Sequence, residues 1–268
     1  MTGKLARLLF IPLIFIANSA IAESSVKSPF VNKGEMGIHV NTEFLDQPDD
    51  GLLEDSKGIT TELEYGFTDR LEAGFDFTAG DSGSDKMEYQ MTGFQSTFQF
   101  TEQDDGNPVS TAVRAQYKVS HTAADQLSGM VIFGRQGDKF GYVLNVGIKS
   151  EVGSSANESV SGDIRASMNY LFRDSFRPGL EYYSDTGELD QLNDINDQQS
   201  RLGPVIYGNI TPNLSYQAGY LLGLSDKGPD GVYKLNLEYK VKLNDNAAAN
   251  TQPVNQQSGY IPQIDFLK

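Results

Sequence analysis

Residues 232–243 read VYKLNLEYKVKL, and this stretch decides the fold class. Every second residue from Tyr233 to Leu243 is apolar, and the residues between them are charged or polar. A period of two places these sets on opposite faces of a β-strand, whereas an amphipathic helix needs a period of about 3.6. The stretch therefore predicts a strand with one apolar face and one polar face.

The same alternation recurs along the chain, for example in ITTELEYGF (59–67) and FGYVLNVGIK (140–149). In 87–100 the apolar phase changes, which predicts a β-bulge near Gly93. The stretch 127–135 alternates weakly and fits either phase. We predict twelve strands, at 35–44, 58–67, 70–78, 87–100, 109–120, 127–135, 139–149, 160–172, 176–183, 199–210, 214–224 and 232–243.

The connections between these strands indicate how the strands are arranged. Connections after even strands are short or have turn composition, and those after odd strands are mostly longer. An even number of strands with alternating short and long connections is typical of bacterial outer-membrane barrels. We therefore predict an all-β fold, a closed antiparallel transmembrane β-barrel of about twelve strands over 35–243. The alternative is a secreted β-sandwich or jelly roll, in which the apolar faces form a core between two sheets.

The two ends of the chain differ from the barrel. Residues 1–22 combine a basic start, an apolar stretch and an Ala-Ile-Ala cleavage site, so we predict a signal peptide that directs export to the outer membrane. Residues 23–34 are expected to form an N-terminal periplasmic segment. The polar C-terminal tail 244–268 is rich in Asn and Gln at its start, which favours disorder, and the alternatives are insertion as a plug or binding to a periplasmic partner.

Composition excludes several classes of function. The chain has 268 residues and a formal net charge of -15, which disfavours nucleic acid as a partner because phosphate binding needs a basic surface. It has no cysteine, which excludes disulfides, thiolate metal sites and cysteine nucleophiles. We expect no cofactor.

The last third of the chain carries the most specific pattern. Gly179-Leu180-Glu181-Tyr182-Tyr183, Gly203-Pro204 and 234–239 (KLNLEY) resemble the outer-membrane transporter family labelled "MetA-pathway of phenol degradation". The resemblance is clear over 176–243, whereas the earlier strands share only the general alternating pattern of the family. It implies a barrel that passes aromatic or other small compounds. Unlike the usual outer-membrane barrel, this chain continues past its last strand into a polar tail.

The polar face of the strands gives the candidate site. If the apolar face meets lipid, the polar residues face the lumen, with acids on the early strands and bases on later ones. This separation predicts either a transverse field that selects solutes or paired charges that fill the interior. The predicted lumen-lining residues are Glu62, Glu64, Glu72, Asp76, Arg114, Lys118, Lys149, Arg165, Arg177 and Glu181.

The long connections hold most of the excess acid. Carboxylates are the ligands that Ca²⁺ and Mg²⁺ prefer, although acidic loops are commonly only solvated. The candidate cation contacts are Asp49, Asp50, Asp190 and Asp194. The spacing of an EF-hand is absent, and no dedicated metal site is predicted.

Signals for catalysis are weak. The chain has two histidines, His39 and His121, and none of the common nucleotide, protease or esterase motifs. We therefore expect a passive outer-membrane channel for small molecules rather than an enzyme. The alternatives are a closed structural or surface-interaction barrel with acidic loops and, third, a lipid-modifying barrel enzyme. The expected partners are outer-membrane lipid, small solutes and the barrel assembly machinery.

Overall fold

The computed structural model describes residues 24–47, 55–81, 86–104, 106–154, 156, 159–190, 198–225 and 228–243. Every helix or strand assigned within these residues is a β-strand. The strands are β1 (Glu35–Asp46), β2 (Ser56–Gly66), β3 (Leu71–Asp81), β4 (Glu88–Thr101), β5 (Ser110–Ser120), β6 (Asp125–Gln136), β7 (Phe140–Val152), β8 (Val160–Tyr170), β9 (Arg177–Glu188), β10 (Gln199–Thr211), β11 (Leu214–Gly223) and β12 (Gly231–Lys242). Among the described residues, no helix is long and apolar enough to cross a bilayer.

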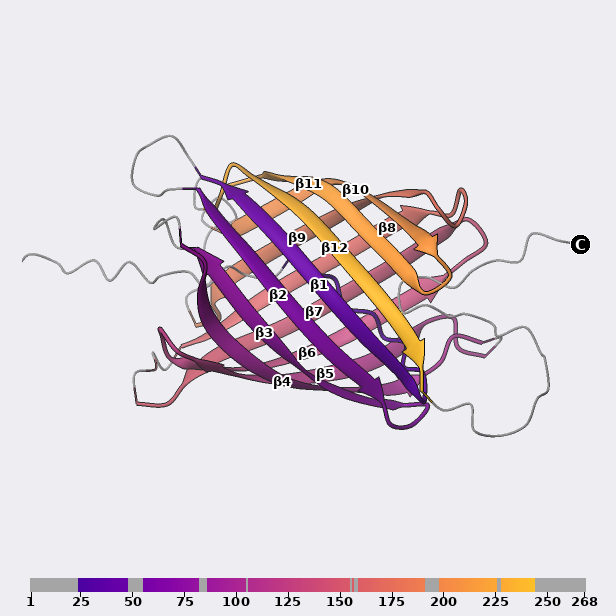
Figure 1. Cartoon of the computed structure of the whole chain (residues 1–268), viewed down its shortest axis with the longest axis horizontal. Coiled ribbons are helices and arrows are strands. Elements are labelled where there is room, and N and C mark those ends of the chain that lie inside the picture. Colours follow the sequence, from indigo (N-terminus) through magenta and orange to yellow (C-terminus); the bar gives the residue numbers. More distant parts are fainter. Residues whose placement is uncertain are drawn as a thin grey trace, which may run out of the picture.

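Each strand pairs antiparallel with its neighbours in sequence, and β1 pairs with β12, so the sheet is a closed barrel (Figure 1). The seam is complete, because the register between β1 and β12 runs from Glu35 opposite Lys242 to Asp46 opposite Gly231. Closure leaves no unpaired strand edge, which is the condition for crossing hydrocarbon with strands. The prediction of a closed twelve-strand antiparallel barrel is confirmed.

The outward face of the wall is apolar. Phe75, Leu144 and Val146 are between 39% and 44% exposed, while their inward-facing neighbours Asp76 and Asn145 are completely buried. The polar residues are buried inside and the apolar residues are exposed outside, which is the reverse of the arrangement in a soluble domain. The β-sandwich alternative is therefore wrong.

Aromatic side chains gather near both ends of the wall. Phe44 and Tyr233 lie where the long connections begin, with ring centroids 6.2 Å apart. Phe140 and Tyr170 lie at the end with the short turns, with centroids 5.3 Å apart. Two aromatic bands that flank an apolar belt mark the two interfaces of a membrane.

The irregular strand β4 differs from its prediction. The register shift lies opposite Thr78 and Ala79, so the extra residue is Gln90 rather than a residue near Gly93. Gly93 has another role, because a Cβ atom there would lie 2.0 Å from the Asp76 Oδ2 atom. The weakly alternating strand β6 turns Ile132 inward, with no exposed surface, and leaves Phe133 39% exposed to the outside.

A charge on the outer belt tests this orientation. We expect Val146→Arg, near the middle of β7, to lower the free energy of unfolding by about 2–4 kcal/mol, because arginine there must enter hydrocarbon. Leu127→Arg, near a strand end, is the matched control and should cost about 1 kcal/mol or less. Urea unfolding in lipid vesicles measures both changes. Equal losses for the two variants would contradict the assigned membrane belt.

Candidate functional site inside the barrel

The charged side chains that the sequence assigns to the lumen all lie on inward faces of their strands. Glu62, Asp76 and Glu181 are each 1% exposed or less, and Arg177 is 2% exposed. Glu64, Glu72, Lys118, Lys149 and Arg165 are partly buried on the same inward faces. The structure therefore brings the predicted residues to one interior surface.

Opposite charges on this surface are paired locally. Arg114 of β5 lies 3.2 Å from Glu62 and 2.9 Å from Glu64, both on β2. Lys118 lies 3.6 Å from Asp76, which also accepts a hydrogen bond from Gln116 at 2.8 Å. The acidic residues of β2 and β3 thus form ion pairs with basic residues of β5, two or three strands away along the wall.

The later strands follow the same rule. Lys149 bonds to Asp185, and Arg165 lies 2.9 Å from Asp163. Lys234 of β12 lies 2.7 Å from Glu181 of β9, and neither side chain has any exposed surface. Buried charges need such partners to offset their desolvation. Of the two expectations for the lumen, the geometry matches the paired network rather than two separated arcs.

The barrel interior also holds part of the chain itself. Residues 24–33 run inside the wall before β1 begins, as the indigo trace in Figure 1 shows. Ser24, Ser25 and Val26 are at most 3% exposed. This placement differs from the periplasmic segment expected for 23–34, because the polar lumen offers the backbone of this segment hydrogen-bond partners.

Basic side chains of the wall bind two backbone carbonyls of this segment. Lys234 donates a hydrogen bond to the carbonyl oxygen of Ser24 at 2.6 Å. Arg165 donates to the carbonyl oxygen of Ser25 at 3.0 Å. The amide of Ser24 in turn donates to the carboxylate of Glu43. The segment therefore binds β1, β8 and β12 within two of its residues.

Lys27 is bound through both its backbone and its side chain. Asn145 of β7 accepts a hydrogen bond from the Lys27 amide at 2.7 Å and donates one to the Lys27 carbonyl at 2.8 Å. The Lys27 ammonium lies 2.6 Å from Glu62. Further along, the amide of Val31 donates to Gln99 at 3.1 Å. Together these contacts hold the segment against strands on both sides of the lumen.

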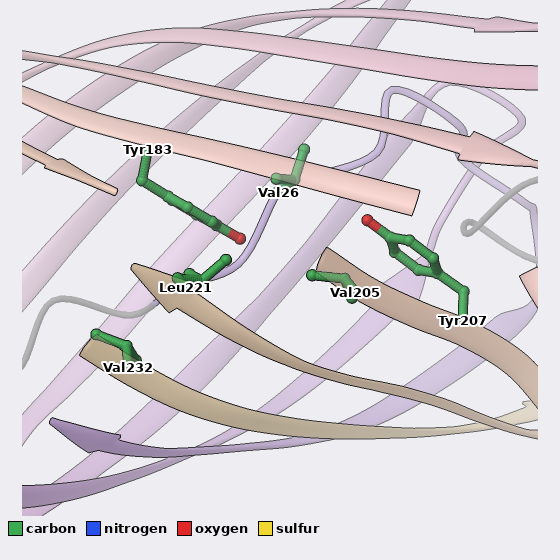
Figure 2. Close-up of a cluster of buried hydrophobic side chains, with 6 residues drawn as sticks. All are labelled: Val26, Tyr183, Val205, Tyr207, Leu221 and Val232. Atoms are coloured by element: carbon green, nitrogen blue, oxygen red, sulfur yellow. The ribbon is translucent and has the colours of Figure 1, made fainter. Parts of the chain in front are cut away.

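Between these polar contacts, Val26 occupies an apolar cluster on the inner wall of β9–β12. Figure 2 shows Val26, on the segment that crosses the lumen, surrounded by side chains from these strands. The wall residues of the cluster are Tyr183, Val205, Tyr207, Leu221 and Val232. An apolar patch inside an otherwise polar lumen is a place where an apolar side chain gains free energy by leaving water.

Two glycines of the wall leave room for the segment. A Cβ atom at Gly134 would lie 2.6 Å from the Cγ atom of Pro29. A Cβ atom at Gly66 would lie 2.0 Å from the carbonyl oxygen of Asn32. Any larger residue at either position must displace the segment or the wall.

Sequence reasoning missed this segment and its partners. Residues 24–33 show no alternation and no motif, so only an unassigned cation, Lys27, and the apolar residues Val26 and Val31 could have suggested a buried position. Asn145 and Lys234 lie on the polar faces that the alternation predicts, but nothing in the sequence distinguishes them from the other polar residues of their strands.

The two histidines lie in different surroundings. His39 faces the interior, where its Nε2 atom lies 3.1 Å from Glu64 and 3.7 Å from Glu238. His121 follows β5, and its ring lies 4.7 Å from the ring of Tyr89. A lipid-modifying site would need a histidine with its acid at the lipid boundary, and His39 belongs instead to the interior ion pairs.

The candidate cation contacts remain predictions. Asp49, Asp50 and Asp194 lie outside the described residues, and Asp190 ends the described part of the connection after β9. Within the described ranges, no group of three or more His, Asp or Glu side chains is arranged to hold a metal ion.

A groove of about 520 Å³ lies against the outer side of the wall between β6 and β10. It lies over Ala166, whose small side chain pairs across the sheet with Leu144 and Tyr182. Because the groove is lined mostly by outward-facing apolar side chains, it faces hydrocarbon and does not belong to the lumen.

Solved structures show where this architecture occurs. An outer membrane channel from Pseudomonas putida F1 has a TM-score of 0.58 at 13% identity, covering 78% of this chain and 96% of that one. The NanC porin has a TM-score of 0.54 at 8% identity, covering 77% of this chain and 100% of the porin. The fold is that of an outer-membrane β-barrel.

The KdgM porin is a third example, with a TM-score of 0.52, 8% identity and coverage of 76% of this chain and 98% of that one. At these identities the likeness is one of fold alone. No protein-family model and no curated protein matches the chain. The comparisons therefore support the fold of an outer-membrane β-barrel, without a family assignment.

Proposed function

We propose that this barrel is a passive outer-membrane channel for small molecules, whose flux is limited by residues 24–33 inside the lumen. The observation that supports this proposal is the set of hydrogen bonds that hold the segment to the wall, from the Lys234–Ser24 bond at one end to the Val31–Gln99 bond at the other. A twelve-strand barrel is intermediate between filled eight-strand and open sixteen-strand barrels, so one extended chain fills much of its lumen.

The composition of the wall supports small solutes of mixed polarity. Ion pairs such as Arg114 with Glu62 and Lys234 with Glu181 neutralise the wall locally, and the cluster around Val26 adds an apolar patch. Such a wall does not favour one sign of charge strongly. The resemblance of 176–243 to the phenol-degradation barrel family supports aromatic compounds among the solutes.

The test uses the absence of cysteine from the chain. Val26 and Leu221 belong to one buried cluster, so in Val26→Cys with Leu221→Cys a reducible bifunctional thiol reagent can cross-link segment and wall. We expect a low, steady conductance in planar bilayers when the link is formed. Reduction should raise the conductance several-fold or introduce openings, because the segment is then released to move.

Leu221→Cys with Val232→Cys is the matched control, because these two residues of the cluster lie directly opposite each other on β11 and β12 and their link leaves the segment untethered. Its conductance should not depend on the link. If neither pair conducts in either redox state, the protein is not a channel.

The second candidate is a closed barrel with a structural or surface-interaction role. It is favoured by the same filled interior, since paired charges and residues 24–33 occupy the lumen. Complete absence of conductance, with a folded barrel in the membrane, would support it.

The two ends of the chain concern export and assembly of the barrel. Residues 1–22, a signal peptide by sequence, and the tail 244–268 lie outside the described residues. We propose that the chain is exported, that the barrel assembly machinery inserts it, and that it faces outer-membrane lipid with its apolar belt.

A further inference from the structure

The contacts of residues 24–27 are those of a peptide in a binding site. We propose that the inner wall of this barrel contains a site for extended peptides, which residues 24–27 occupy as a tethered ligand. The class of free ligand is a short peptide with an apolar residue followed by lysine or arginine. This site lies in the lumen of the proposed channel and therefore rests on the proposed function. Binding of a peptide to it does not itself require that the barrel conducts solutes.

The segment runs along much of the barrel. Ser24 binds the carboxylate of Glu43, which lies opposite Gly58 of β2, and Asn32 packs on Gly66 at the far end of the same strand. These two contacts lie near opposite ends of β2.

The wall recognises the peptide backbone. In an extended chain the N–H and C=O of one residue point to the same side, and the Asn145 side chain bonds both of these groups on Lys27, at 2.7 and 2.8 Å. Asn145 has no exposed surface, so its amide is held in place. Charged donors from Lys234 and Arg165 reach the carbonyls of Ser24 and Ser25. Bonds from charged donors are the stronger kind.

The wall also distinguishes side chains. The cluster of Tyr183, Tyr207 and Leu221 accepts an apolar side chain at the position of Val26. Glu62 accepts a cation at the next position, where the Lys27 ammonium lies 2.6 Å away. An apolar residue followed by a basic one is therefore the pattern that fits.

Three charged residues of the site, Lys234, Arg165 and Glu62, are also held by side chains of the wall, so we expect them to keep their positions without the segment. Lys234 is held by Glu181 at 2.7 Å and by the hydroxyl of Tyr183 at 3.0 Å. Arg165 is held by Asp163 at 2.9 Å. A free peptide would meet donors that are already positioned, which lowers the entropic cost of binding.

Glu62 is held in the same way, by Arg114 at 3.2 Å, Asn41 at 2.9 Å and Gln95 at 3.0 Å. Loss of Lys27 leaves this carboxylate in position with one cation fewer beside it. The vacated place attracts a basic side chain rather than an anion.

The experiment measures binding in detergent to the barrel from which residues 24–33 have been deleted. The probe is the fluorescently labelled synthetic peptide Ser-Ser-Val-Lys-Ser, which reproduces residues 24–28. We expect saturable binding by fluorescence anisotropy. Peptides with aspartate in place of valine, or glutamate in place of lysine, should bind about tenfold more weakly or worse, since each loses a contact of about 1.5 kcal/mol or more.

Matched variants of the deleted barrel locate the site. Asn145→Leu should weaken binding about tenfold, because it removes two backbone hydrogen bonds. Asn169→Leu is the control, because this asparagine is equally buried in β8 and lies at a different position of the inner wall. It should leave the affinity for the peptide unchanged.

If the deleted barrel does not fold, as judged by heat-modifiable gel migration, the full chain with Val26→Asp and Lys27→Glu takes its place. This chain weakens its own ligand and should bind the free peptide more tightly than the unchanged chain does. Absence of saturable binding to a folded barrel, or equal binding of all three peptides, would overturn the site. Binding without conductance would defeat the channel alone, and conductance without binding would defeat the site alone.

Discussion

Replacing Lys234 by methionine is expected to lower the free energy of unfolding by about 3–5 kcal/mol, because it leaves the buried charge of Glu181 without its cation. Both side chains are fully buried and 2.7 Å apart. Glu181 also accepts hydrogen bonds from the hydroxyls of Tyr207 at 2.6 Å and Tyr183 at 2.8 Å, which cannot neutralise its charge. The chain has no tryptophan, so circular dichroism and gel migration follow urea unfolding in vesicles.

The double variant Lys234→Met with Glu181→Gln serves as the control. It removes both charges and keeps most of the volume, so it should regain most of the lost stability. A double variant as unstable as Lys234→Met alone would show that packing, rather than the unpaired carboxylate, explains the loss.

The second large effect is expected at Gly134. In Gly134→Val the new side chain overlaps the ring of Pro29, and we expect the segment 24–33 to move rather than the wall, because β6 is paired on both sides in the closed sheet. We expect single-channel conductance to rise several-fold, because the lumen then holds less of the chain. Planar bilayer recording measures this change.

Gly129→Val on the same strand is the matched control, because a Cβ atom at Gly129 meets nothing within 4 Å. Its conductance should equal that of the unchanged protein. A similar rise in both variants would point to a general loosening of β6, and no rise in Gly134→Val would show that the segment does not limit conduction.

Strands could be predicted because lipid and lumen impose opposite demands on neighbouring residues. In 232–243 the apolar residues Tyr233 and Leu235 face the lipid side and Lys234 faces the lumen, as the period of two predicts. Strand ends were less certain, and β9 extends to Glu188 rather than ending near 183. Beyond Tyr183 the residues Ser184, Asp185 and Thr186 are all polar, so no alternation marks the end of pairing.

The contents of the lumen could not be predicted in the same way. The inward position of Glu62 follows from its place in the alternation, but its partners Arg114 and Lys27 depend on how the closed sheet brings distant strands together. The residues before β1 obey no period, because they contact the wall on several sides. Their position follows only from the shape and chemistry of the finished interior.

The complete seam between β1 and β12 has a consequence for biogenesis. Residues 24–33 lead into β1 and lie within the closed wall, so the segment is either enclosed while the β1–β12 seam forms or enters the lumen afterwards from the end where β1 begins. Either route requires a narrow, unfolded chain ahead of β1. A rigid globular domain fused just before Ser24 is too bulky to be enclosed, so affinity labels for purification belong in the loops.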